Sequence, residues 1–76
     1  MTVDDKVRAW LMRERPGLVE AASPQAVRLK AWGMSGIACS AGEFIDALVR
    51  AGVRVDQVRQ TYRLALPAWS VGETRR

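Results

Sequence analysis

The sequence predicts an all-α fold, a single compact bundle of four short helices. Four segments are bounded by residues that start and stop helices, and only the stretch "GVRVD" at 52–56 has a pattern compatible with a strand. Apolar residues make up 49% of the chain and charged residues 26%, a balance typical of a folded domain. We expect one domain, 1–76, with a C-terminal tail at 67–76 and helices at about 3–14, 24–32, 41–51 and 55–66.

The first two helices are predicted from the residues at their ends. Thr2 is a suitable N-cap for a helix whose apolar residues recur along one side. Pro16 ends that helix, because the residue before a proline avoids helical geometry. The second helix is expected to begin after Ser23, with Pro24 at the first helical position, where its missing N–H has no partner to lose. Gly33 is its expected end.

The third helix has the strongest local signal in the sequence. Ser40 and Glu43 have the spacing of a capping box, in which each side chain accepts a hydrogen bond from the other residue's backbone N–H. Gly52 follows at the position where a left-handed residue commonly ends a helix. A fourth helix is then predicted up to Pro67, with an apolar repeat of 3.6 residues along one side.

Length and residue types exclude most chemistry. A chain of 76 residues buries only a small core, so a homodimer or a partner protein is one source of further stability. There is no histidine, and the one cysteine, Cys39, is expected to be a small buried hydrophobe. We therefore predict no catalytic residue, no metal site and no cofactor, and do not expect an enzyme. No segment has the roughly 18 apolar residues of a membrane span, so the chain is expected in the cytoplasm.

The side of 55–66 opposite its apolar residues carries hydrogen-bonding side chains. Glutamine and arginine make paired hydrogen bonds with adenine and guanine edges in the major groove of DNA. The predicted base-contacting residues are Gln57, Gln60 and Arg63. Residues 50–76 contain six arginines and two acids, which suits contact with phosphates, although a solvated arginine surface is the alternative. The predicted phosphate contacts are Arg50, Arg54 and Arg59, and Arg75 and Arg76 extend this stripe.

Residues 44–63, less than a third of the chain, resemble a helix-turn-helix motif. Gly52 matches the glycine of the turn, and Val58 matches a buried position after it. Two positions depart from the motif: Leu48 stands where a small residue is preferred, and Thr61 where a larger apolar residue is usual. The resemblance implies a small DNA-binding regulator whose second helix enters a groove of duplex DNA.

Trp69 supports a different class of function. It follows Pro67 near the end of the chain, and an exposed tryptophan beside arginine is a frequent anchor in protein interfaces. The alternative function is a small protein-binding adaptor or inhibitor, of the plasmid and phage accessory type, with an apolar patch that contains Trp69. Folding of Trp69 back onto the bundle is the other expectation for this side chain. Salt-sensitive duplex binding distinguishes the regulator from a salt-tolerant adaptor complex.

Overall fold

The chain forms helices and a small antiparallel sheet, so the fold class is α+β. The computed structural model describes residues 1–14 and 16–71. The elements are α1 (Val3–Glu14), a 3₁₀ turn η1 (Pro16–Leu18), β1 (Glu20–Ala21), α2 (Pro24–Ser35), α3 (Ala41–Arg50), β2 (Arg54–Val58), β3 (Thr61–Ala65) and a 3₁₀ turn η2 (Ala68–Val71). The prediction of an all-α bundle of four helices is therefore wrong. The expected tail contains η2, and residues 72–76 lie outside the described ranges.

The segment predicted as a fourth helix, 55–66, is a β-hairpin. β2 and β3 pair antiparallel over five residues each, across a two-residue turn at 59–60. The apolar residues Tyr62, Leu64 and Leu66 alternate with other side chains, a pattern that fits a strand as well as one side of a helix. Valine and threonine are frequent here, and β-branched residues favour an extended backbone. Pairing of β3 with β1 adds a tertiary contact that no local pattern in the sequence indicates.

The sheet has three antiparallel strands in the order β1-β3-β2. Directly opposed residues of an antiparallel pair point to the same face of a sheet. The inner face, which packs against the core, therefore carries Ala21, Val55, Tyr62 and Leu64. The outer face carries a row of three charged residues, Glu20, Arg63 and Asp56, one from each strand.

The predicted start of the third helix and the left-handed glycine after it are confirmed, and α3 ends at Arg50, one residue before its predicted end. The Ser40 hydroxyl accepts a hydrogen bond from the Glu43 backbone N–H at 3.1 Å, and the Glu43 carboxylate accepts one from the Ser40 N–H at 3.0 Å. Gly52, just beyond α3, has a φ of 92° in the left-handed region that glycine tolerates. The chain can therefore leave α3 and enter β2 within three residues.

The second helix begins as predicted and ends later than predicted. The Ser23 hydroxyl caps α2 by accepting a hydrogen bond from the Ala26 N–H at 3.1 Å. The helix continues through Gly33, because glycine within a helix weakens it without ending it. It stops at Ser35, where Gly36 takes a left-handed backbone with a φ of 70°.

α2 packs against all three strands of the sheet, and α3 packs against both α1 and α2. The rings of Trp10 on α1 and Phe44 on α3 meet edge to face, with their centroids 5.8 Å apart. The largest fully buried side chains are Phe44, Leu11, Leu48, Val7 and Val27. From the sheet, Leu64 is buried in the same cluster. The core therefore lies between the helices and the base of the hairpin.

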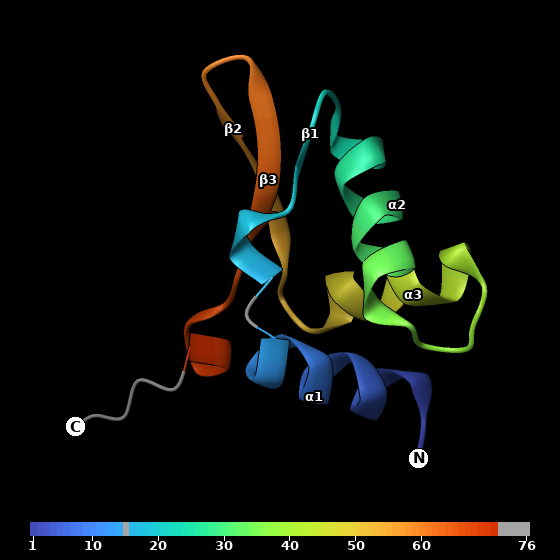
Figure 1. Ribbon diagram of the computed structural model, residues 1–76. Helices are drawn as coiled ribbons and strands as arrows, with labels where there is room; N and C mark the ends of the chain where they lie inside the picture. The colour runs from blue at the N-terminus through green and yellow to red at the C-terminus, as the bar shows by residue number, and fades with distance from the viewer. Residues whose placement is uncertain (15, 72–76) are drawn as a thin grey trace.

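The hairpin and α1 lie at opposite ends of the molecule (Figure 1). The turn between β2 and β3 points away from α1, and α2 runs beside β1 and β3. Within residues 1–14 and 16–71, no helix is long and apolar enough to cross a membrane. The fold thus presents two separate surfaces, one at the hairpin turn and one along α1.

Candidate nucleic-acid interface

The turn of the hairpin has an unusual backbone. Arg59 and Gln60 connect Val58 to Thr61, which face each other across the ladder. Arg59 has a φ of 62° and is the one non-glycine residue with a positive φ in the described part of the chain. A left-handed backbone costs an ordinary residue about 1–2 kcal/mol, and two-residue hairpin turns favour asparagine and glycine for that reason. An exposed arginine therefore occupies a position that favours glycine.

Side chains next to the turn hold it in place. The Gln57 side-chain amide donates a hydrogen bond to the Arg59 carbonyl oxygen at 3.2 Å. The Thr61 hydroxyl donates one to the Val58 carbonyl oxygen at 3.1 Å. These bonds hold the backbone of the turn, so the Cα–Cβ direction of Arg59 is defined.

The three residues predicted to contact bases do not share one face. Gln57 lies on the inner face of β2, opposite Tyr62, and Gln60 lies in the turn. Arg63 lies on the outer face of β3, where its Nη1 is 3.7 Å from the Glu20 carboxylate and its other cross-strand neighbour is Asp56. The helix that was predicted to align them does not exist. Gln57 and Gln60 remain close to the turn, whereas the charge of Arg63 is compensated within the sheet.

The three predicted phosphate contacts are also divided between elements. Arg54 begins β2 and Arg59 lies in the turn, five residues further on and roughly 16 Å away along an extended strand. Both are exposed, and neither forms an ion pair with an acid among the described residues. Arg50 belongs to α3, and Arg75 and Arg76 lie outside the described residues. The hairpin therefore carries two of the predicted contacts on one projecting element.

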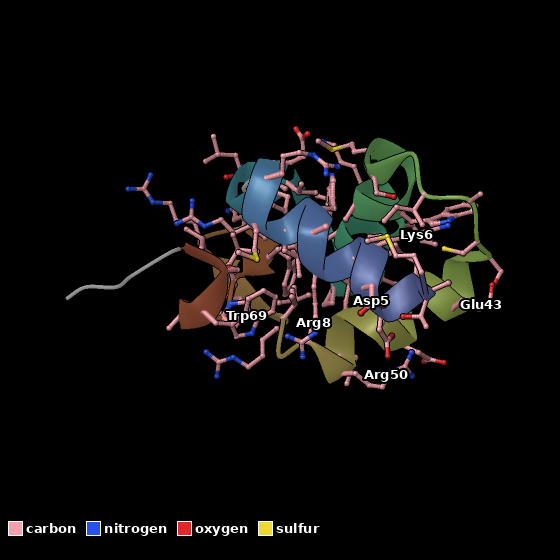
Figure 2. The ribbon with its side chains drawn as sticks, turned by 90° about the horizontal axis from the view of Figure 1, so that it is seen from below. Asp5, Lys6, Arg8, Glu43, Arg50 and Trp69 are labelled. Carbon is pink, nitrogen blue, oxygen red and sulfur yellow. The ribbon has the colours of Figure 1, made fainter. Side chains whose placement is uncertain are left out.

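Arg50 is held by an acid on the first helix. Its Nη2 is 2.7 Å from Oδ1 of Asp4, and its Nε lies 3.1 and 3.2 Å from the two carboxylate oxygens. This hydrogen bonding lowers the pKa of Asp4 below its usual 3.8 and raises the pKa of Arg50. Figure 2 shows Arg50 beside the start of α1. The pair joins α1 to the end of α3, so Arg50 has a structural role that its place in the sequence did not suggest.

Trp69 lies against the end of α3, with part of its surface exposed. Its indole N–H donates a hydrogen bond to the Ala51 carbonyl oxygen at 3.0 Å, and 36% of its surface remains accessible. The Arg8 guanidinium lies over its ring, 4.8 Å from the centroid (Figure 2). Arg8 was not among the residues predicted for a site. Arg8 and Trp69 are near opposite ends of the sequence, so no local pattern could have revealed their contact.

The outer face of α3 is acidic rather than basic. Glu43 and Asp46 are exposed on it, and Val49 is 62% exposed. Its one basic residue is Arg50, which Asp4 already engages. Acidic side chains oppose the approach of phosphates, so this helix is poorly suited to a DNA backbone.

Comparison of the chain with protein-family models, with curated proteins and with solved structures finds no match. Residues 1–14 and 16–71 contain no group of three or more histidine, cysteine, aspartate or glutamate side chains placed to hold a metal ion. Cys39 is partly buried, and its carbonyl oxygen accepts a hydrogen bond from the Trp32 indole at 2.9 Å. A functional proposal therefore depends on the hairpin and on the other surfaces described above.

Proposed function

We propose that this chain is a small DNA-binding regulator that contacts duplex DNA through the β2–β3 hairpin. The observation that carries the proposal is the exposed Arg59, held at a positive φ at the projecting turn. Backbone strain that is maintained at an exposed position is typical of binding sites. In this proposal the chain works in the cytoplasm, beside the DNA that it binds.

The dimensions and side chains of the hairpin suit a groove of DNA. The major groove of B-form DNA admits a two-stranded ribbon as well as a helix, and several DNA-binding proteins read bases with strands. Arg54 and Arg59 would contact phosphates, which position a protein on the duplex without reading its sequence. Gln60 in the turn and the exposed Gln57 beside it would face base edges. Arg63 would support the sheet through Glu20 rather than contact DNA.

The order of the elements supports the same function by analogy. The segment that the resemblance at 44–63 takes as its second helix is the β2–β3 hairpin, so the analogy applies to other elements. Two helices, α2 and α3, are joined by residues 36–40 and followed directly by this hairpin, which is the element order of a helix-turn-helix domain with a hairpin wing. In a helix-turn-helix the second helix, here α3, enters the major groove. Because α3 exposes Glu43 and Asp46, we assign the principal contact to the hairpin instead.

Fluorescence anisotropy with a labelled duplex of mixed sequence tests the proposal. Titrations at about 50 and 200 mM salt compare the natural chain with the double variant Arg54→Ala/Arg59→Ala. If both arginines contact phosphates, the dependence of log affinity on log salt becomes shallower by about 2 in the double variant. Lys6→Ala/Arg13→Ala is the matched control, because it removes two positive charges from α1, at the other end of the molecule.

The proposal requires binding at low salt that weakens in the hairpin double variant and is retained in the α1 double variant. No binding at 50 mM salt, or equal losses in both variants, would contradict contact through the hairpin. The protein-binding adaptor remains the second candidate because Trp69 is partly exposed. A complex that resists salt and is lost in Trp69→Ala would favour it.

A further inference from the structure

A groove runs along α1 on the side that faces the connector between α2 and α3. Its volume is about 430 Å³, and it is lined by Met1, Lys6, Ala9 and Arg13 and by residues 35–38. Pockets of roughly 300–1,000 Å³ accommodate small ligands or a few side chains. Figure 2 shows Lys6 on the opposite side of α1 from Arg8 and Arg50, so this groove is separate from the contact with Trp69.

The groove has a positive charge toward each end. Lys6 and Arg13 are seven residues apart on α1, which places them on the same side of the helix and roughly 10 Å apart along its axis. Lys6 forms no ion pair with any acid in the described ranges. The Arg13 Nε lies 3.2 Å from the Glu14 carboxylate, which leaves the two terminal nitrogens of its guanidinium available. Two separated cations therefore border the same hollow.

The middle of the groove is apolar. Ala9 lies between the two cations on α1, and Ile37 and Ala38 line the opposite wall. Ile37 is partly buried and packs against the core, so this wall is held in place. The Ser35 hydroxyl accepts a hydrogen bond from the Ile37 N–H at 3.1 Å and fixes the connector at the end of α2. The groove thus combines a small apolar floor with positive ends.

We propose that this groove binds an extended acidic segment of a partner protein, with an apolar residue between two carboxylates. In an extended chain, residues i, i+2 and i+4 point to the same side, and the outer two are roughly 13 Å apart. The side chains of Lys6 and Arg13 are flexible enough to span the difference from their 10 Å spacing. Acidic residues at i and i+4 would pair with the two cations, and an apolar residue at i+2 would occupy the floor.

An acidic peptide fits this groove better than a nucleic acid does. A sugar–phosphate backbone has no apolar group to place between Ala9 and Ile37. A peptide with leucine at i+2 fills that space with an apolar side chain. The groove also lies along α1, away from the hairpin turn that we propose for DNA (Figure 1). The inference therefore does not depend on the proposed function. Binding of DNA at the hairpin would leave the groove along α1 open to the acidic partner.

The test uses short acetylated peptides and the full chain. Backbone amide NMR spectra of the labelled protein are recorded with up to about 2 mM of the peptide Glu-Ser-Leu-Ser-Glu, a concentration sufficient for weak affinities. We expect saturable shifts at residues 6–13 and 35–38 and none at 58–61. Replacing the central leucine by serine should weaken binding severalfold. The double variant Lys6→Glu/Arg13→Glu should lose at least tenfold in affinity, and Arg54→Glu on the hairpin should lose none.

A charge exchange makes the result decisive. The peptide Lys-Ser-Leu-Ser-Lys should fail to bind the natural chain and should bind the Lys6→Glu/Arg13→Glu variant, a gain that misfolding cannot produce. Absence of saturable shifts with the acidic peptide, or equal binding by the natural chain and the double variant, would overturn the proposal. Displacement of the acidic peptide by duplex DNA would also overturn it, because the groove would then be part of a DNA surface.

Discussion

Replacement of Arg59 by glycine should stabilise the fold and weaken DNA binding at the same time. Arg59 has a φ of 62°, and this left-handed backbone costs an ordinary residue about 1–2 kcal/mol. Glycine removes that strain but loses about 0.5–1 kcal/mol more than other residues when its backbone is ordered. The difference between these two ranges is about 0–1.5 kcal/mol, so the net expectation for Arg59→Gly is a stabilisation of about 0.75 kcal/mol. For a domain of this size, a stabilisation of about 0.75 kcal/mol raises Tm by about 3–6 °C.

The same substitution removes one proposed phosphate contact. One fewer released counterion corresponds to a loss of about fivefold to tenfold in affinity at 0.1 M salt. Thermal unfolding followed by circular dichroism measures the first effect, and anisotropy with a labelled duplex measures the second. An increase in Tm together with a decrease in affinity is the expected result, and general damage to the fold cannot produce it.

Gln60→Gly is the matched control in the same turn. Gln60 is not among the residues with a positive φ, so glycine there relieves no strain and should destabilise the fold by about 0.5–1 kcal/mol. Opposite changes in Tm for the two glycine variants would support the structure of the turn. If Arg59→Gly lowered Tm as Gln60→Gly does, the positive φ at Arg59 would be refuted. Unchanged affinity in Arg59→Gly would refute its phosphate contact.

Three further predictions concern the core, a cap and an ion pair. Phe44→Ala should lower the free energy of unfolding by about 3–5 kcal/mol, because Phe44 is fully buried. Urea unfolding measures this loss, and a value below about 1 kcal/mol would contradict the place of Phe44 in the core. Ser40→Ala should destabilise by about 1 kcal/mol through loss of the capping box, and an unchanged Tm would mean that α3 begins elsewhere. Asp4→Asn should lower Tm at pH 7. A carboxylate whose pKa is lowered by folding stabilises the fold fully above its unfolded pKa of about 3.9, and this effect is lost as pH falls through the lower folded pKa. The two Tm values should therefore approach each other as pH falls below the unfolded pKa and become equal below the folded one. A difference that stays constant throughout this acid range would exclude the ion pair as its cause.

Local signals in the sequence predict the helices and miss the sheet. The capping box of Ser40 and Glu43 and the left-handed Gly52 are determined by neighbouring residues, so sequence reasoning finds them. The hairpin is harder to find because its turn is Arg59–Gln60 rather than asparagine and glycine, so the usual hairpin signal is absent. The two-residue strand β1 has almost no pattern of its own and exists because β3 lies beside it.

The sequence predicts which hairpin arginines are available to a candidate site, but not how the other predicted residues are grouped. Arg54 and Arg59 were predicted from charge alone, which does not depend on secondary structure, and both remain exposed on one element. Gln57, Gln60 and Arg63 were grouped by a helical period of 3.6, and the period of 2 in the hairpin separates them. The contacts between Arg50 and Asp4 and between Arg8 and Trp69 join residues far apart in the chain. Only the folded structure brings such residues together.

A map of the surface that contacts DNA tests the central claim most directly. Backbone amide spectra of the labelled protein are recorded during titration with a duplex of mixed sequence, at low salt where even non-specific binders reach micromolar affinity. The hairpin proposal predicts the largest shifts at residues 54 and 57–61, with small changes at 42–46 on the acidic face of α3. The largest shifts at 42–46, or shifts confined to α1 and Trp69, would contradict it.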